Sequence, residues 1–407
     1  MSLAIQEMFC KPTRMQNILT FLLILSYGGV WVQFFTYPTE LLCILLALFI
    51  LSKSHIKIFY PDRFKRLYLI IVFLCLLSAV ITGTSIAKYI SFFYRPVIAI
   101  LILNAFRFDA ELFKKSLVKA LKFICHLALF SFIVLPFIHD YLPLLVSSSE
   151  FPIKTLGFIV NIPPNNPPYI DFIFPIHRNQ GIFTEPGLLG IVANIYLFVL
   201  LFEYKLKIKQ CWLPILTIFT AMSTTGFLIF GFQLFIWGIK FIYANEGYRL
   251  KSILGVVLVF LLLLPFVYSE VNSKFTREGG TGREYDTFMA FEIAMNNPLI
   301  GIGPDKNRYF LETRKYEVIV NDRLRSEERG NSNGLIALLC WMGVPIAILF
   351  LYGIYKQNLF SSSRLIFIVI ICMAFFGEPN ILNDFIFLIL ISSSLKGKQL
   401  VTAITKI

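Results

Sequence analysis

The sequence predicts an all-α integral membrane protein with about a dozen transmembrane helices and two long external loops. Three features of its composition support this class of fold. Hydrophobic residues make up 57% of the 407-residue chain, charged residues make up only 15%, and the mean hydropathy is +0.74. A water-soluble globule needs more polar surface than this composition supplies, so the chain belongs in a lipid bilayer.

Apolar runs along the chain mark the candidate spans. Five lie in the first half, at residues 18–35, 41–51, 67–81, 90–106 and 121–138. The others lie at residues 188–202, 212–222, 227–243, 253–268, 335–352, 365–376 and 381–395. Several runs are shorter than the roughly 20 residues that cross a bilayer, so their helices extend into flanking residues, or a short pair such as 212–243 is re-entrant. The first run lacks a small-residue cleavage site and is expected to be a retained helix.

Lysine and arginine residues gather in every second connection, which predicts that these connections and both termini face the cytoplasm. Those after the second and fourth spans are Lys53, Lys57, Arg63, Lys65 and Arg66, and then Arg107, Lys114, Lys115, Lys119 and Lys122. This distribution accounts for the net charge of +13 and leaves no basic surface that points to nucleic acid.

The seven cysteines form no C-x-x-C pair, which indicates neither disulfides nor a zinc site.

Two segments on the opposite side are too long to be simple connectors, and external loops of this length usually carry function. The expected order is spans one to five over residues 1–139, a first loop over 140–180, spans six to nine over 181–269, a second loop over 270–333, and three spans with a cytoplasmic tail over 334–407. In the second loop, Gly301 and Gly303 of NPLIGIGP are expected to be backbone turn positions and not ligand contacts.

A cation and a carboxylate frame the entry to the sixth span, where the chain reads HRNQGIFTEPGLLG. Two interpretations are open. In one, Arg178 snorkels at the interface, and Glu185, followed by Pro186, sits at a helix N-terminus where the dipole favours an anion. In the other, Arg178 and Glu185 belong to a functional site at the membrane surface.

At this point the sequence resembles a known family. The string R-x-x-G-x-F-x-E-P-G over residues 178–187 resembles the first-loop signature of Wzy-type O-antigen polymerases. Arg283 in GGTGRE, followed by a helix and then by NPLIGIGP, is similar to the second-loop pattern of the O-antigen ligase and polymerase superfamily. The segment NSNGLIALLCWMG resembles the end of that loop and the helix after it. The resemblance covers residues 178–353.

The resemblance implies a glycosyltransferase of the outer face of the bacterial cytoplasmic (inner) membrane. Such an enzyme moves a glycan from undecaprenyl diphosphate to a hydroxyl of another lipid-linked repeat unit, needs no metal or cofactor, and has a chain-length regulator protein as a candidate partner. By this resemblance Arg178 and Arg283 bind the diphosphate with Arg277 as a helper, and Glu185 is the catalytic base. Planar guanidinium groups suit a diphosphate because each can contact two oxygens. The remaining substrate-binding candidates of the loops are His177, Asn331 and Asn333.

Arg95 is a further substrate-binding candidate because it lies well inside the fourth span, where an unpaired guanidinium is costly. It is expected either to face the protein interior or a wet cavity, or to snorkel toward the interface near Lys88. Glu378 in FGEPNILND is expected to mark a helix break in the last external connector.

Two rival functions stay open. A lipid-linked oligosaccharide flippase would bury ionisable residues along a transport path, whereas here charges gather in one external loop. An O-antigen ligase is expected to carry a histidine where this chain has Gly330 before Asn331. The chain also departs from its apparent relatives at Ser223, Thr224 and Thr225, where a Ser-Arg pair is frequent.

Overall fold

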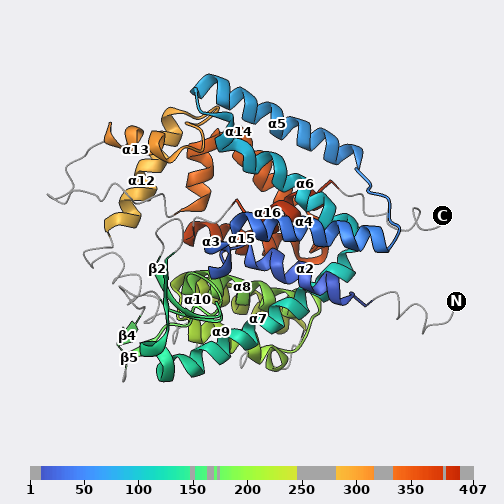
Figure 1. Ribbon diagram of the computed structural model, residues 1–407, viewed down its shortest axis with the longest axis vertical. Helices are drawn as coiled ribbons and strands as arrows, with labels where there is room; N and C mark the ends of the chain where they lie inside the picture. The colour runs from blue at the N-terminus through green and yellow to red at the C-terminus, as the bar shows by residue number, and fades with distance from the viewer. Residues whose placement is uncertain are drawn as a thin grey trace. The chain divides into compact units, whose positions relative to one another are not determined.

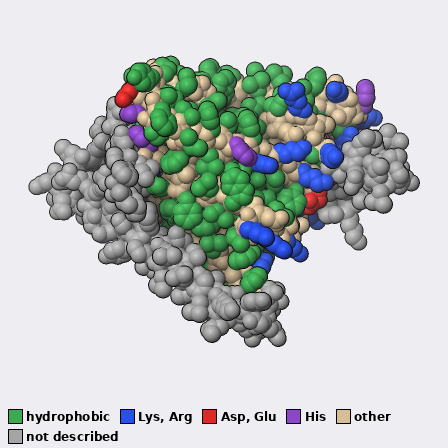
Figure 2. Space-filling view, turned by 90° about the horizontal axis from the view of Figure 1, so that it is seen from below, with side chains coloured by type: hydrophobic (Ala, Val, Ile, Leu, Met, Phe, Trp, Pro, Cys, Tyr) green, Lys and Arg blue, Asp and Glu red, His purple; other side chains and the backbone are tan. Residues whose placement is uncertain are grey.

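The computed structural model describes residues 11–146, 152–162, 169–171, 175–244, 281–315, 333–378 and 382–394. The described chain is mostly helical, as predicted, but it also contains five short β-strands that the all-α prediction did not include. Six segments are long and apolar enough to cross a membrane: Asp62–Thr82, Ile86–Ala105, Ala110–Tyr141, Pro186–Glu203, Thr224–Phe241 and Gly334–Tyr355. Hydrophobic side chains accordingly cover a broad area of the surface in Figure 2. The chain is therefore a multi-pass membrane protein, while the span count of about a dozen and the orientation stay predictions.

The chain divides into two compact units. Unit 1 comprises Met1–Leu46 and Ala110–Val271, and unit 2 comprises Ala47–Asp109 and Asn272–Ile407. Helix α4 (Thr36–Lys53) runs from the first unit into the second. Figure 1 shows the labelled elements of both units. The predicted span at 253–268 lies outside the described residues.

Unit 1 is built mainly from helices, of which α7 is the longest. Its helices are α2 (Arg14–Leu25), α3 (Val30–Phe34), α7 (Ala110–Ile138), α8 (Pro186–Phe198) with a π-helical turn (Val199–Glu203), α9 (Trp212–Ala221) and α10 (Thr224–Ala244). Short 3-10 helices, η2 (His139–Tyr141) and η4 (Ile208–Cys211), follow α7 and precede α9. At 10 residues α9 rises only about 15 Å, half of the hydrocarbon thickness, so it is too short to cross the bilayer alone.

The first predicted span is not one helix. The prediction of a continuous helix over residues 18–35 is wrong, because α2 ends near Ser26 and α3 begins after Gly29. The freed backbone groups find partners in the segment before α8. The N–H of Val30 donates to Ile182 O at 2.8 Å, and Gly29 forms an antiparallel bridge with Phe183. The break is therefore closed by backbone hydrogen bonds, as burial in a membrane protein requires.

Helix α7 starts earlier than the sequence indicated. The prediction placed Lys114 in a cytoplasmic connection, but the residue lies in the first turns of α7 with its side chain only 8% exposed. Its Nζ lies 3.0 Å from Glu203 Oε2 and also pairs with Glu111. The carboxylates neutralise the charge of Lys114, so the lysine does not end the helix.

Two small antiparallel sheets follow α7 in the described chain. Strands β1 (Leu144–Val146), β2 (Pro152–Leu156) and β3 (Val160–Ile162) pair in the order β1-β2-β3, and β4 (Tyr169–Asp171) pairs with β5 (Pro175–His177). The first sheet packs on the end of α7 through a buried cluster of Leu135, Leu142, Val160 and Ile162. Its position is therefore fixed relative to that helix.

Helices α8 and α10 approach closely at a pair of glycines. A Cβ on Gly190 would lie only 3.2 Å from the Cα of Gly226. The amide of Asn194 on α8 donates to Gly226 O at 2.9 Å, and Gln233 donates to Asn194 Oδ1 at 2.9 Å. Small residues and interhelical hydrogen bonds are the usual means by which helices associate in membranes.

Unit 2 contains the remaining helices. They are α5 (Asp62–Thr82), the 3-10 helix η1 (Ile86–Tyr89), α6 (Ile90–Ala105), α12 (Thr281–Asn296), α13 (Lys306–Arg314), α14 (Gly334–Tyr355), the 3-10 helix η6 (Ser361–Ser363), α15 (Arg364–Gly377) and α16 (Asp384–Ser392). Helix α14 contains a break at Gly343, whose φ of 75° and ψ of 173° are not helical. Helix α16 covers 9 residues, far fewer than the run predicted over residues 381–395.

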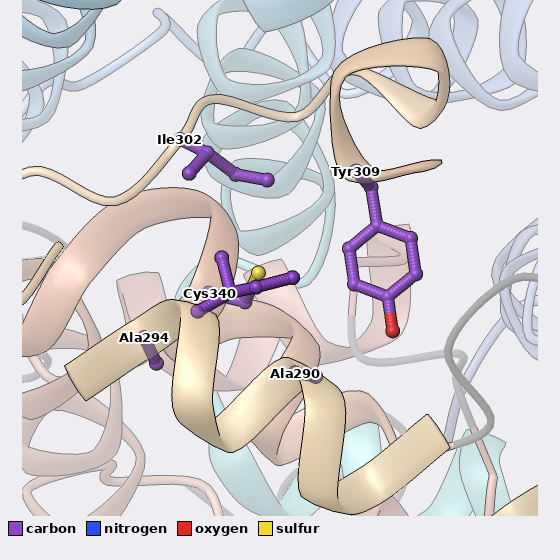
Figure 3. Close-up of a cluster of buried hydrophobic side chains, with 6 residues drawn as sticks. Ala290, Ala294, Ile302, Tyr309 and Cys340 are labelled. Atoms are coloured by element: carbon purple, nitrogen blue, oxygen red, sulfur yellow. The ribbon is translucent and has the colours of Figure 1, made fainter. Parts of the chain in front are cut away.

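The segment NPLIGIGP fills the break in α14. Two carbonyls of the broken helix, Cys340 O and Trp341 O, accept hydrogen bonds from the N–H groups of Ile302 and Gly303, each at 2.9 Å. Figure 3 shows the apolar side of this arrangement, where Ile302 and Cys340 meet Ala290 and Ala294 of α12 and Tyr309 of α13. The segment thus replaces the hydrogen bonds that the break removes.

Glycine is required at the centre of this arrangement. A Cβ on Gly301 would lie 2.5 Å from Cys340 O, and a Cβ on Gly343 would lie 2.7 Å from Ile300 N. Gly301 and Gly303 have positive φ values of 70° and 84°. The prediction that these glycines serve the backbone is confirmed.

Candidate functional site

The segment HRNQGIFTEPG of unit 1, called the entry segment below, covers residues 177–187, from the last residue of β5 to the first turn of α8. Asn179 fastens it to two helices. The N–H of Asn179 donates to Thr220 O at 3.0 Å, and its amide donates to Thr220 Oγ1 and to Ala128 O, both at 3.0 Å. The entry segment is therefore tied to the end of α9 and to the middle of α7 by a side chain that is 2% exposed.

Gly181 lets the entry segment lie flat against α7. Its φ is +54°, and a Cβ there would lie 2.9 Å from the Cβ of Ala128. Its N–H donates to Asn179 Oδ1 at 2.9 Å, and its carbonyl accepts from Asn161 Nδ2 at 2.7 Å. Further along, the N–H of Thr184 donates to Gly28 O at 3.1 Å. Three helical regions and the sheet thus hold this backbone in one conformation.

Glu185 is the N-cap residue of α8, and Pro186 begins the helix. The structural interpretation is thus right about its position, where the helix dipole favours an anion. The Glu185 side chain is exposed, however, and makes no capping hydrogen bond. Within the described chain it also forms no ion pair. Its carboxylate is therefore presented to the surroundings and not consumed by the fold.

Arg178 is partly buried at the start of the entry segment, next to the buried His177. The ring of His177 lies 5.5 Å from that of His139, centroid to centroid, and His139 Nε2 lies 3.2 Å from Asp140 Oδ1. Burial, and secondarily the charge of His139, lower the pKa of His177 below its usual 6.5. His177 is therefore a neutral imidazole at pH 7 and can accept a proton or a hydrogen bond.

Gln180 is a polar residue of this segment that the sequence did not single out. It is 2% exposed. Neither its Oε1 nor its Nε2 has a hydrogen-bond partner in the part of the chain that the structure describes. An unsatisfied buried amide costs about 1 to 3 kcal/mol, so its retention here needs a reason beyond stability. Only knowledge of the fold identifies Gln180, because a glutamine beside a glycine carries no signal in the sequence.

Arg95 faces the interior of unit 2. Its guanidinium donates to Leu382 O, and its Nε lies 3.6 Å from Asp384 Oδ1. The two side chains are 17% and 2% exposed. Of the two expectations, the interior location is the one observed, and the ion pair with Asp384 gives Arg95 a structural role in joining α6 to α16.

The other second-loop candidates lie in unit 2 or outside the described residues. Asn333 is the N-cap of α14 and its Oδ1 accepts from Leu335 N and Ile336 N at 3.1 and 3.2 Å, so this oxygen serves the helix. Arg283 lies in the first turns of α12. Arg277 and Asn331 lie outside the described residues.

Three candidates, His177, Arg178 and Glu185, lie in the entry segment of unit 1, whose backbone is held by the hydrogen bonds described above. The predicted helix break at Glu378 is confirmed, since Glu378 is the C-cap of α15 and is buried. Among the described residues, no group of three histidine, cysteine, aspartate or glutamate side chains is arranged to hold a metal ion.

Comparisons with known proteins add no family to these observations. No protein-family model matches the sequence, and no curated protein matches it.

Proposed function

We propose that this protein is a polysaccharide polymerase of the Wzy type, which extends lipid-linked glycans at the outer face of a bacterial cytoplasmic membrane. One observation carries the proposal: a membrane protein fixes the entry segment through three helices and leaves the Glu185 carboxylate exposed and uncommitted at its end. Rigid backbone around free polar side chains is the arrangement expected of a site that must hold reacting groups in place.

The proposed reaction is a glycosyl transfer between two lipid-linked units. The oxygen of an acceptor hydroxyl attacks the anomeric carbon of the donor glycan, and the bond from that carbon to the undecaprenyl diphosphate breaks. The diphosphate leaves with the electron pair, and the hydroxyl proton goes to a base. Negative charge grows on the departing diphosphate, where arginine side chains lower the energy of the transition state.

Arg178 is the proposed diphosphate ligand of unit 1, and Glu185 is the proposed base. Arg283 lies in unit 2 and is proposed as a diphosphate ligand from the resemblance alone. His177 offers a second acceptor for the proton, because its lowered pKa keeps the ring neutral at pH 7. Arginine suits the first role better than lysine because a planar guanidinium can contact two phosphate oxygens at once.

The test uses purified protein with synthetic undecaprenyl diphosphate repeat units. We expect a ladder of products spaced by one repeat unit, formed equally well in excess EDTA. A ladder that disappears on chelation and returns with magnesium would contradict the metal-independent mechanism. Absence of any product longer than one unit from folded protein would contradict the polymerase itself.

A lipid-linked oligosaccharide flippase is the second candidate, and two features of unit 2 favour it. The ion pair of Arg95 and Asp384 is buried within apolar helices, and α14 is broken at Gly343. Buried ionisable groups and broken helices are both common in transporters. In liposomes, a flippase would move a labelled lipid-linked unit across the bilayer without lengthening it, whereas a polymerase would lengthen it.

A further inference from the structure

Helix α7 of unit 1 carries a stripe of exposed apolar side chains. Phe123, Phe130, Ile133 and Phe137 are 54%, 56%, 65% and 77% exposed. Their separations of seven, three and four residues place them on one face of the helix. In a multi-pass membrane protein, such a face contacts lipid.

This apolar surface does not end where α7 ends. Tyr141 of η2 is 85% exposed, and Leu144 and Val146 of β1 are 55% and 59% exposed. These residues follow the stripe directly along the chain. The exposed apolar surface of α7 therefore continues through η2 into β1. A sheet in an aqueous loop normally turns polar side chains to the water.

The position of strand β1 is fixed relative to helix α7. The sheet packs on α7 through the buried cluster of Leu135, Leu142, Val160 and Ile162, whose strand residues belong to β3, two strands away from β1. Strand β3 is buried along its whole length. The depth of β1 in the membrane is therefore set by the depth of the end of α7.

The length of α7 fixes that depth. Lys122 is the last lysine of the helix, and the next charged residue along the chain is Asp140. The sixteen residues from Lys122 to Ile138 rise about 24 Å, roughly 6 Å less than the hydrocarbon thickness of about 30 Å. Tilt shortens the rise further. If Lys122 lies at one membrane surface, α7 is therefore too short to place β1 in the water beyond the opposite surface.

Aromatic residues of unit 1 also indicate a membrane interface near the sheet that contains β1. Phe158, in the turn between β2 and β3, lies against Trp31 and Phe35 at ring distances of 5.3 and 6.1 Å. Tyr37, just beyond Phe35, is 80% exposed. Tryptophan and tyrosine concentrate where hydrocarbon meets water.

We propose that Tyr141 and the outer edge of β1 lie in the lipid headgroup layer of the membrane leaflet at the C-terminal end of α7. The partner of this surface is lipid. The edge lies at headgroup depth and not in the hydrocarbon. Among the described strands β1 is outermost, and its outer backbone groups, which no described strand pairs with, need water or headgroups. This inference does not depend on the proposed function, and its test does not use activity.

The test measures depth with single cysteine variants that carry a nitroxide, in the full-length protein reconstituted into phosphatidylcholine vesicles. The variants are Leu144→Cys and Val146→Cys. Phe130→Cys on the stripe of α7 is the lipid control, and Lys207→Cys in the exposed connection before α9 is the water control. The protein labelled without a new cysteine gives the background. Paramagnetic resonance then compares accessibility to oxygen with accessibility to a water-soluble nickel chelate.

We expect an oxygen-to-nickel accessibility ratio at both strand positions that is several-fold above that at Lys207 and below that at Phe130. A ratio equal to that at Lys207 would place the strand in water and overturn the proposal. A ratio equal to that at Phe130 would place it in the hydrocarbon and overturn the assigned depth. Low accessibility to both reagents would show that protein covers the strand, either a second copy or another partner, and would also overturn it.

Discussion

Two helix breaks in the described chain are closed by backbone hydrogen bonds from a distant segment, but the two closing segments carry different side chains. In unit 1, residues of the entry segment pair with the break between α2 and α3 at Gly28 to Val30. In unit 2, NPLIGIGP pairs with the break in α14 at Gly343. Each closing segment contains glycine with positive φ and donates backbone N–H groups to freed carbonyls.

The difference lies in the side chains. Apart from Asn297, whose amide donates to Ile293 O at 3.0 Å, NPLIGIGP contributes apolar side chains and backbone groups. Its neighbours Ser78 and Thr84 hydrogen-bond to its carbonyls at 3.3 and 3.5 Å. The entry segment also closes a break, but it adds an exposed carboxylate at Glu185 and a buried amide at Gln180 that the described fold does not use. The described fold therefore uses the polar groups of NPLIGIGP but leaves Glu185 and Gln180 of the entry segment unused, and we locate the proposed function in the entry segment.

The largest expected effect is a loss of stability at the break in α14. In Gly343→Ala, the new Cβ would meet backbone atoms of Leu299 and Ile300 at 2.7 Å while φ is 75°. We expect a loss on the order of 5 kcal/mol, since overpacking against backbone and left-handed strain add together. The yield of folded protein in fluorescence-detected size-exclusion chromatography should collapse.

The matched control for this experiment is Gly231→Ala in α10, because a Cβ there meets nothing within 4 Å. That variant should fold normally or gain up to about 1 kcal/mol from better helix propensity. Normal yield of Gly343→Ala would show that α14 can close its break without NPLIGIGP.

The second prediction separates a structural arginine from a functional one. Arg95→Met leaves Asp384 buried without its partner, which should cost about 3 to 5 kcal/mol and lower the unfolding temperature in detergent. The double variant Arg95→Met with Asp384→Leu should regain most of this loss, because no charge is then left buried. If the double variant is no more stable than the single one, the pair does not hold α6 against α16.

The third prediction tests the two proposed diphosphate ligands, Arg178 of the entry segment and Arg283 of α12. Arg178→Lys and Arg283→Lys should each slow polymer formation by roughly ten- to a hundredfold, the effect of losing about 1.5 to 3 kcal/mol of charge-assisted contact in the transition state. Lysine keeps the charge but cannot contact two oxygens at once. Thermal unfolding should be unchanged, in contrast to Arg95→Met.

The control for these variants is Arg314→Lys at the end of α13, an arginine with no assigned role. It should leave the length and amount of polymer unchanged. Full activity of both Arg178→Lys and Arg283→Lys at normal expression would sink the assignment of these residues to the diphosphate.

A smaller effect is expected at Gln180, where one substitution should raise stability but lower polymer formation. Gln180→Met replaces a buried amide that has no partner in the described chain by a side chain of similar size, and should raise stability by about 1 kcal/mol. If the amide serves the site, the same variant should make less polymer. Higher stability together with full activity would show that the amide has no part in the reaction.

The smallest effect concerns pH. The pKa of His177 is lower in the folded protein than in the unfolded chain, so below pH 6.5 the unfolded state binds more protons. The contribution of His177 to stability is therefore complete above pH 6.5 and declines as the pH falls toward the folded pKa. The fall in unfolding temperature between pH 7.5 and 5.5 should be smaller in His177→Gln than in the unmodified protein. His126→Gln, at an exposed position on α7, should not reduce it.

The helices of this fold were largely predictable because they follow continuous apolar runs. The run at 90–106 corresponds to Ile90–Ala105, and the run at 335–352 lies within Gly334–Tyr355. The breaks were not predictable, because the partners that stabilise them are distant in the chain. Thr184 and Gly28, which bond across the first break, are 156 residues apart, and no local pattern reports such a pairing.

Part of the candidate site was also visible in the sequence. Arg178 and Glu185 stand out because charge is scarce beside a span. Asp384 was missed although it could have been found, since a buried arginine such as Arg95 needs a carboxylate at the same depth. Gln180 could not have been found, because its significance comes from burial without partners, which is a property of the packed structure.

The ion cluster around Lys114 also bears on how the protein is made. Its partner Glu203 lies 89 residues further along the chain, so at about 5 to 20 residues per second the ribosome needs roughly 4 to 18 seconds to supply it. A lysine held without a carboxylate for that time would oppose the insertion of α7 into the bilayer. Glu111 lies one turn away on the same helix and pairs with Lys114. The nascent helix therefore carries its own temporary counterion until α8 arrives.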